Sequence, residues 1–173
     1  MGTGLGDLAI IGPRSVRLNA SLGKAGFKTA TDILRMPDDD DLPSDNHSPS
    51  ELVAFSDVLG SGQQHLVRIR HNEMKCWPNL GRGRFGKGRV IAPLDFAYES
   101  FDASRILLAD LDGSGATDLI YLQADGARIF MNCFGNGLAA PIKLPWPNGL
   151  HLDRFCQVRA ADLQGTGCSS LVI

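Results

Sequence analysis

The sequence predicts an all-β fold made of β-propeller blades, with about three four-stranded antiparallel blades that form part of a larger propeller. Three observations favour this fold. A glycine-rich motif recurs at intervals of 53 and 52 residues, each copy leads into a short apolar run, and no segment of the sequence has sustained helical periodicity. Four short strands in about 50 residues are the usual unit of a propeller blade.

The repeated motif reads D-x-x-G-[ST]-G, and its copies begin at Asp57, Asp110 and Asp162. A second half-motif, an asparagine followed by two spaced glycines, begins at Asn79 and at Asn132, which are again 53 residues apart. Because both halves recur at the same interval, the pattern is an internal repeat and not one isolated loop.

A truncated copy of the motif opens the chain. Its glycines at residues 2 and 4 align with those of the later copies, and Asp7 takes the place of Asp118. In its second half, Asn19 is expected to take the place of the later asparagines, and Phe27 that of the residue closing each half-motif. The chain thus begins inside one motif and ends just after another, which predicts either a fragment of a longer polypeptide or a set of three circularly offset units.

These repeats divide the chain into consecutive units. We expect a first blade at residues 1–54 with an acidic loop inserted at 36–51, a second blade at 55–107 and a third at 108–160. Residues 161–173 would begin the next blade, and they are one candidate to close on the N-terminal segment.

Four strands can be placed within the third unit. Leu119–Leu122 is apolar and rich in strand formers, and Asp125-Gly126 is a two-residue turn signal before a second strand at Ile129–Asn132. A third strand is expected at 140–146. A fourth is expected at 155–162, where the chain enters the next motif.

The loop at Asp110 offers the oxygen donors that calcium prefers. The donors would be the side chains of Asp110, Asp112, Ser114 and Asp118 together with the backbone carbonyl of Ala116. The other two copies lack acidic residues at the third and ninth positions. What all copies share is a turn that the first aspartate can cap. A structural Ca²⁺ site is therefore expected at this loop alone, and a turn without an ion remains the alternative.

Composition and motif spacing argue against several classes of function. A net charge of −2 and a pI near 6.0 argue against binding to nucleic acid or to an anionic membrane surface, so the basic stretch 81–89 is expected to be a turn. No apolar run approaches the roughly 20 residues needed to cross a bilayer, which argues against direct membrane insertion. The four cysteines lack C-x-x-C spacing, which argues against zinc. The histidines are scattered, without a serine elbow or a cysteine partner. We therefore expect no enzyme activity and no catalytic residue.

The acidic run at 38–41 lies in a segment rich in proline and serine and is expected to be a solvated loop. The first ten residues lack the features of a secretory signal.

Trp77 and Trp146 each stand beside a proline. Tryptophan is enriched in binding hot spots, so both are candidate interface residues. The alternative is that they pack between neighbouring blades, because an aromatic side chain can bury a large area.

The motif at Asp110, D-x-D-G-x-G-x-x-D before an apolar strand, resembles the FG-GAP/VCBS repeat of integrin-like propellers. More narrowly, residues 55–88, 101–122 and 153–173 together resemble the middle, N-terminal-side region of the B component of insecticidal toxin complexes (Tc toxins). The similar stretches occur in the same order and keep their connecting lengths across most of residues 50–173.

The resemblance implies a non-enzymatic docking and gating scaffold of a secreted, extracellular bacterial toxin. In that family the B component joins the C component to form a hollow shell around a toxic enzyme. The propeller docks on the pore-forming A component, and the unfolded enzyme passes through it. The A and C components are the implied partners, and exposed sheet edges favour self-association of the fragment. The alternative is a calcium-stabilised, integrin-like adhesion or glycan-binding propeller.

Overall fold

The structure is a computed structural model that describes residues 5–11, 15–34, 42–43, 48–81, 83–153 and 156–173. The described residues form β-strands, short 3-10 helices and connecting turns, with no α-helix among them, which confirms the all-β prediction. Within the same residues, no helix has the length and apolar character needed to cross a membrane. The acidic run at 38–41 and the glycines at residues 2 and 4 lie outside the described residues.

The main sheets are antiparallel and follow one another along the chain. The first contains β1 (Leu8–Ile11), β2 (Ser15–Asn19) and β3 (Thr31–Leu34). The second contains β4 (Glu51–Ser56), β5 (His65–Arg70), β6 (Glu73–Trp77) and β9 (Arg89–Pro93). The third contains β10 (Ile106–Ala109), β11 (Asp118–Gln123), β12 (Gly126–Phe130) and β13 (Ile142–Pro145). The fourth contains β14 (Arg159–Ala161) and β15 (Ser170–Val172).

The connections hold the remaining short elements. A small hairpin of β7 (Asn79–Gly81) and β8 (Arg84–Phe85) interrupts the connection from β6 to β9. Single-turn 3-10 helices lie at η1 (Gly23–Ala25), η3 (Tyr98–Ser100), η4 (Ala103–Arg105) and η5 (Pro147–Gly149).

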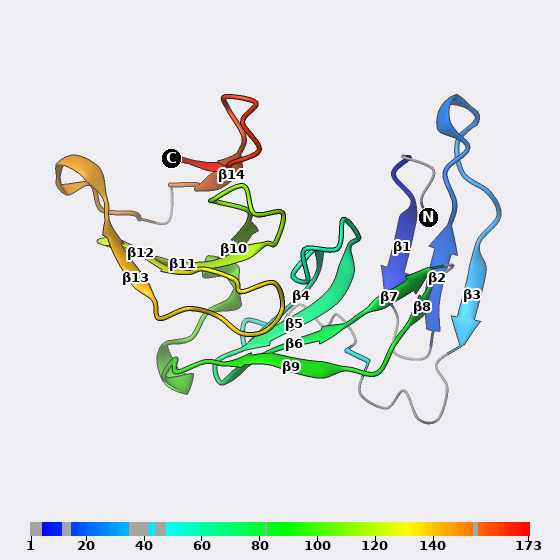
Figure 1. Cartoon of the computed structure of the whole chain (residues 1–173), viewed down its shortest axis with the longest axis horizontal. Coiled ribbons are helices and arrows are strands. Elements are labelled where there is room, and N and C mark those ends of the chain that lie inside the picture. The colour runs from blue at the N-terminus through cyan, green and yellow to red at the C-terminus, as the bar shows by residue number, and fades with distance from the viewer. Residues whose placement is uncertain (1–4, 12–14, 35–41, 44–47, 82, 154–155) are drawn as a thin grey trace.

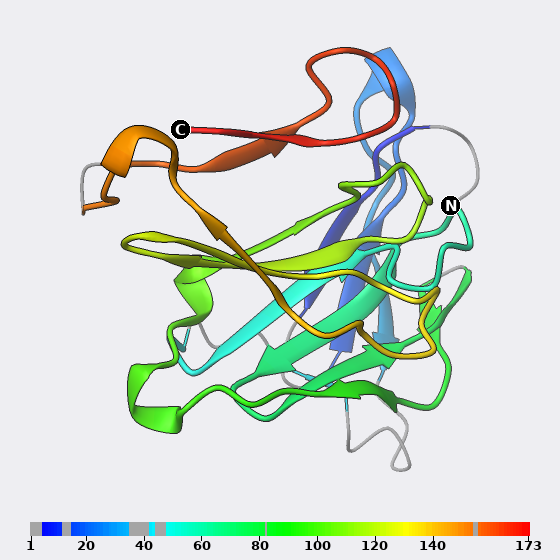
Figure 2. The same ribbon diagram turned by 60° about the vertical axis from the view of Figure 1, so that its left-hand side comes forward.

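The sheets are layered in chain order, from β1–β3 through the two four-stranded sheets to β14–β15 (Figure 1, Figure 2). They do not close into a ring, and the arrangement is consistent with part of a larger propeller.

Apolar cores fill the space between the second and third sheets and between the third and fourth. Val67 and Met74 of the second sheet pack in one cluster with Leu119 and Tyr121 of the third. Ile120, the residue between those two, points to the opposite face and packs towards the fourth sheet. Because successive residues of a strand face opposite sides and both faces of β11 are covered, this strand reads as a continuous apolar run.

The hydrogen-bonding pattern shifts the predicted unit boundaries. The strand before each motif loop pairs with the strand after it, so the four-stranded sheets span 51–93 and 106–145. The boundary expected at 55 falls within β4, and the boundary expected at 108 falls within β10. The motif is the turn that joins two antiparallel neighbours, so a division at the motif separates strands that belong together. For the same reason β14, within the expected fourth strand at 155–162, pairs with β15 of the next sheet.

The hairpin between β11 and β12 also differs from the prediction by one residue. Gln123 pairs with Gly126, so the turn residues are Ala124 and Asp125, and Gly126 belongs to the strand. Its glycine is explained by a close approach, because a Cβ atom there would collide with the backbone carbonyl oxygen of Leu144 on β13.

Candidate functional site

The first aspartate of each motif holds its own loop closed. In the loops at Asp57, Asp110 and Asp162, one carboxylate oxygen accepts the N–H four residues on at 2.9–3.1 Å. The other accepts the N–H five residues on at 2.5–2.8 Å. The glycines at the fourth and sixth positions have φ between 63° and 87°, a conformation that favours glycine. The turn shared by the three motifs is thus stabilised by the carboxylate itself.

The ninth position of the motif connects the loop to the second half-motif. In the third sheet, Asp118 accepts the backbone N–H of Asn132 at Oδ1, 2.8 Å away. In the second sheet, His65 stands at this position and accepts the N–H of Asn79 at Nδ1, 3.0 Å away. Aspartate and histidine therefore perform the same structural task in the two repeats, a relationship that residue type alone does not reveal.

The truncated N-terminal copy shows the same bond with a different partner. Asp7 accepts the backbone N–H of Ser21 at 2.8 Å, and Ser21 pairs with Phe27 across a short bridge. The expectation that Asn19 takes the place of the later asparagines is wrong, because Ser21 occupies it, whereas Phe27 has the predicted place. Asn19 lies in β2 and donates its side-chain amide to the carbonyl of Lys28 at 3.1 Å.

The acidic side chains of the Asp110 loop lie together. Carboxylate oxygens of Asp110, Asp112 and Asp118 lie within 4.8 Å of one another, a grouping that fits a hard cation such as calcium. Of the other two predicted donors, Ser114 accepts the N–H of Ala116 at its Oγ atom, 3.3 Å away. Burial raises the pKa of Asp118, although backbone hydrogen bonds oppose that shift. Hydrogen bonds from Ser114 lower the pKa of Asp112.

Backbone hydrogen bonds join each loop to the next. The N–H of Thr117 donates to the carbonyl oxygen of Asp57 at 2.9 Å, and the N–H of Ser169 donates to that of Asp110 at 2.7 Å. Both bonds link the eighth position of one motif to the first position of the preceding motif. They carry no side-chain signature, which is why the sequence does not predict them. The loops consequently gather at one end of the layered sheets.

The second half-motif of the third sheet adds a side-chain link to the same end. The amide Nδ2 of Asn132 donates to the carbonyl oxygens of Val58 and Thr117, at 2.9 and 2.8 Å. One asparagine thus bonds to both of the neighbouring motif loops. Loss of this side chain would leave buried carbonyl groups without their partners.

The two tryptophans predicted as interface residues are buried. Trp77 is 1% exposed and packs with Leu42 and Leu66, and Trp146 is 5% exposed and packs in a cluster with Ile120. The indole nitrogen of Trp146 donates to the carbonyl of Gln123 at 3.1 Å. In this chain both residues belong to the cores beside the sheets, so the packing alternative describes them and neither is an exposed anchor.

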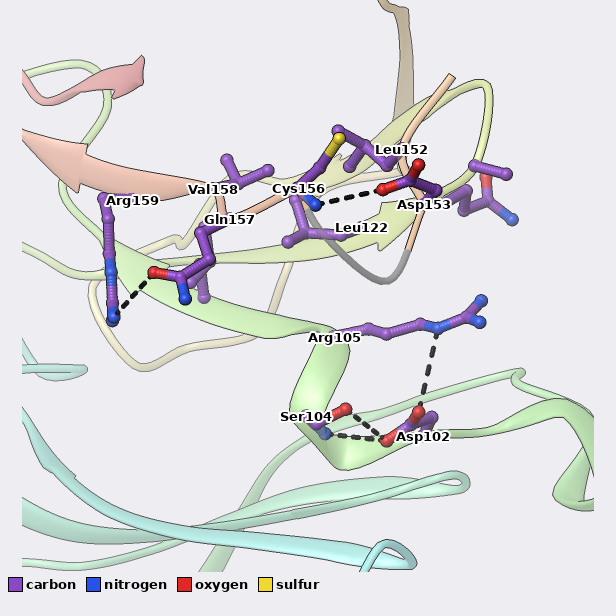
Figure 3. Close-up of a pocket in the computed structure, with 13 residues that line it drawn as sticks. Asp102, Ser104, Arg105, Leu122, Leu152, Asp153, Cys156, Gln157, Val158 and Arg159 are labelled. Atoms are coloured by element: carbon purple, nitrogen blue, oxygen red, sulfur yellow. Dashed lines mark hydrogen bonds and ion pairs between the residues drawn. The ribbon is translucent and has the colours of Figure 1, made fainter. Parts of the chain in front are cut away.

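A cavity of about 670 Å³ lies at the opposite end of β11, between η4, the β11–β12 turn and β14 (Figure 3). Its two arginines have partners in the wall. Nε of Arg105 lies 3.8 Å from Oδ2 of Asp102, and Nη2 of Arg159 donates to Oε1 of Gln157 at 3.5 Å. No histidine is among its described lining residues. The described cysteines, including Cys156 in this wall, are free thiols.

Comparison with known proteins identifies the relationship. No protein-family model and no curated protein matches the chain. A chain of the Photorhabdus luminescens Tc holotoxin pore is 48% identical over 98% of this chain, with a TM-score of 0.88. This chain is a region like that of the Tc toxin B component. The crystal structure of TcdB2–TccC3 without its hypervariable C-terminal region is 46% identical over 99% of this chain, with a TM-score of 0.73.

The Tc-like chain spans 8% of the length of each of these toxin chains. A lectin from Agrocybe aegerita that recognises non-reducing terminal N-acetylglucosamine has a TM-score of 0.69 at 21% identity, over 98% of this chain and 43% of the lectin. At that identity the likeness shows a shared fold alone. The predicted resemblance to the toxin complex is confirmed, and the more general FG-GAP/VCBS assignment stays a prediction.

Proposed function

We propose that this chain is the non-enzymatic β-propeller portion of a bacterial toxin-complex B component. In that role it is a docking and gating scaffold for toxin translocation through a pore-forming A component, with a C component as its second partner, and it acts outside the bacterial cell. The observation that carries the proposal is the 48% identity, over 98% of this chain, to a chain of the Tc holotoxin pore.

The construction of the loop end supports a scaffold role. The loop at Asp57 is bonded to Thr117, and the loop at Asp110 is bonded to Ser169. Turns that are bonded to one another keep their positions better than isolated loops, because each is held by its neighbour as well as by its own hydrogen bonds. An end of this kind suits a surface that must keep its shape while another protein docks on it.

The chemistry of the described residues supports a part without catalytic activity. His65 is 3% exposed and both its ring nitrogens have hydrogen-bond partners. The thiol of Cys76 is buried, which raises its pKa to about 11 and keeps it protonated at neutral pH. Neither group is available as a base or a nucleophile.

A region swap tests the proposal. The matching segment of the Photorhabdus TcdB2–TccC3 protein would be replaced by this chain, whose backbone is similar enough for the chimera to fold. We expect the chimera to bind the pore-forming component in a pull-down assay and to deliver its enzyme to cells. A control chimera would carry the matching segment of the lectin, which shares the fold but not the family. A chimera that folds, retains its C component and fails to bind the pore would contradict the proposal.

A second candidate function is supported by the acidic cluster. We propose that Asp110, Asp112 and Asp118 hold a calcium ion that stabilises the loop end, as in a calcium-stabilised adhesion propeller. The ion would add to a turn that the carboxylate of Asp110 already closes, so its expected role is structural. A calcium titration, described in the Discussion, tests this proposal.

A further inference from the structure

The β7–β8 hairpin lies in a stretch of the chain whose charged residues are all basic. Residues 75–94 contain five lysine or arginine residues and no aspartate or glutamate. The equivalent half-motif of the third sheet, residues 132–138, contains no charged residue. The positive charge is therefore particular to this repeat and is not required by the turn that both repeats form.

Three of these cations are exposed and have no acidic partner within the part of the chain that the structure describes. Arg84, Lys87 and Arg89 are exposed, and none of them forms an ion pair among the described residues. On the same hairpin, Leu80 is 60% exposed. Free arginine side chains beside exposed apolar groups are typical of the centre of a protein interface.

A strained aromatic residue lies in the adjacent turn. Phe134 is 53% exposed and has φ of 52°, which is uncommon for a residue other than glycine. It occupies the second place after Asn132, where the preceding repeat has Gly81 with φ of 80°. A glycine at this place would remove the backbone strain. Part of the ring covers Gly60 of the Asp57 loop, and the part that stays exposed is open to a binding partner.

Arg89, which follows the hairpin in sequence and begins β9, connects the hairpin to the aromatic turn. A Cβ atom built on Gly135 would lie 3.3 Å from Nη2 of Arg89, so the guanidinium group lies beside the Phe134–Gly135 turn. Figure 1 shows β7 and β8 projecting beyond β6 and β9. The basic hairpin surface is defined by Leu80, Arg84, Lys87, Arg89 and Phe134.

We propose that the basic hairpin surface binds an acidic polypeptide segment that carries an apolar side chain. The unpaired cations would attract its carboxylates, and Leu80 and Phe134 would cover the apolar group. A nucleic acid fits less well, because the net charge of the chain is −2 and a single ring is exposed in the aromatic turn. The proposal extends the proposed scaffold role by naming the chemistry of a docking partner, and it depends on that role only for the identity of the natural partner.

Fluorescence anisotropy with three labelled probes tests the proposal on the full chain. The probes are a synthetic peptide of glutamate interrupted by leucine, the same peptide with lysine in place of glutamate, and a single-stranded DNA oligonucleotide. We expect the acidic peptide to bind, with an affinity that falls as salt is raised, and to bind more tightly than either other probe.

Two variants connect the binding to these residues. Charge reversal at Arg84, Lys87 and Arg89 to glutamate is expected to weaken binding of the acidic peptide at least about tenfold. The control reverses the charge of three exposed lysines elsewhere, Lys24, Lys28 and Lys143, and should leave the affinity within about twofold.

Phe134→Gly separates binding from folding. It relieves the positive φ, so its denaturant midpoint should stay near that of the parent, while its affinity for the acidic peptide falls about tenfold. The proposal is overturned if the parent does not bind the acidic peptide, if it prefers DNA or the lysine peptide, or if the control reversal weakens binding as much. None of those results would contradict the scaffold role, which the region swap tests separately.

Discussion

The ring nitrogen Nδ1 of His65 accepts a hydrogen bond from the backbone N–H of Asn79 at 3.0 Å. Because Nδ1 is an acceptor, the neutral ring carries its proton on Nε2, which lies 2.8 Å from Oγ of Ser61 and 3.6 Å from Oδ1 of Asp57. A second proton would have to occupy Nδ1, where it would face the N–H of Asn79 and abolish the bond. Protonation of one side chain would thus remove one of the two bonds between the motif loop and Asn79, leaving the bond from Nδ2 of Asn79 to the carbonyl of Gln64.

Acidification is therefore expected to destabilise the fold through His65. Burial lowers its pKa below the ordinary value of 6.5, with Arg89 acting in the same direction and Asp57 opposing. The unfolded chain then binds this proton more readily than the folded chain. The free energy of unfolding should consequently fall as the pH drops through about 6.5 towards the lower pKa of the folded state. Urea unfolding followed by tryptophan fluorescence at several pH values measures this dependence.

Two variants isolate the contribution of His65. His65→Asn keeps a side-chain acceptor without a titrating group, so its stability should depend less on pH than that of the parent. His151→Asn, at an exposed histidine, should keep the parental pH dependence. Asp118 has a raised pKa, so its effect on the unfolding free energy runs in the opposite sense: its stabilising contribution is lost as the pH rises. Because the parent and both variants contain Asp118, this effect cancels in the comparison. Equal slopes for His65→Asn and the parent would refute the prediction.

The glycines of the Asp57 loop should differ in what they tolerate. Both Gly60 and Gly62 have positive φ, at 63° and 77°, so alanine at either costs about 1 kcal/mol of unfolding free energy. At Gly60 the new Cβ would also lie 2.7 Å from Cδ1 of Phe134, whereas at Gly62 nothing lies within 4 Å. We expect Gly60→Ala to cost about 1–3 kcal/mol more than Gly62→Ala, measured by urea unfolding.

The same pair has an internal control. In a Phe134→Gly background the ring is absent, so the two alanine substitutions should cost nearly the same. If Gly60→Ala keeps its excess cost without the ring, the contact with Phe134 is not its cause, and Ala116, whose Cβ lies 3.4 Å away, becomes the explanation.

Gly126 should be intolerant of alanine for a reason other than backbone conformation. Its φ is not positive, and the added Cβ would collide with the carbonyl oxygen of Leu144. The collision would push β13 away from β12, at an expected cost of about 1–3 kcal/mol in unfolding free energy. Asp125→Ala, in the neighbouring turn, should change stability by less than about 0.5 kcal/mol. A stable Gly126→Ala protein with parental amide exchange in β13 would contradict the expectation.

The motif loops could be predicted because they depend on residues close together in the sequence. Contacts between distant segments could not be predicted in this way. Aspartate and glycine at fixed spacing determine the turns at Asp57, Asp110 and Asp162, so their repeat was readable. The place of Asn19 was assigned by residue type, but the structural equivalence depends on the backbone N–H of Ser21, which donates to Asp7. The side chain of Ser21 makes a separate bond, in which its Oγ atom accepts the N–H of Gly23.

Burial of the tryptophans is a second property that the sequence leaves open. A tryptophan beside a proline suits an exposed anchor or a core, and what decides between them is the presence of Leu42 and Leu66 against Trp77. Those residues are separated from it in sequence and meet it only in the folded chain. The bond from Thr117 to Asp57 was unpredictable for the same reason, since it joins two backbone groups of successive repeats.

Calcium is expected to stabilise the folded chain through the Asp110 loop. If the ion binds the folded state alone, calcium at about tenfold above its dissociation constant adds about 1.4 kcal/mol to the unfolding free energy, and the melting temperature rises accordingly. Magnesium at equal concentration should raise it less, because magnesium demands a tighter geometry than this open cluster offers. Calorimetry with each ion, and with EDTA, measures the effect at constant ionic strength.

Asp112→Asn is the variant that separates the ion from the turn. Asp112 is exposed and accepts the N–H of Ser114, whereas the backbone N–H groups that close the turn donate to Asp110, so asparagine should preserve that turn. The calcium-dependent rise should disappear in Asp112→Asn and persist in Asp125→Asn, which removes an equal charge at the other end of β11. A rise that survives Asp112→Asn would assign it to general screening of the carboxylates, and no rise in the parent would leave Asp110, Asp112 and Asp118 with a role in the turn alone.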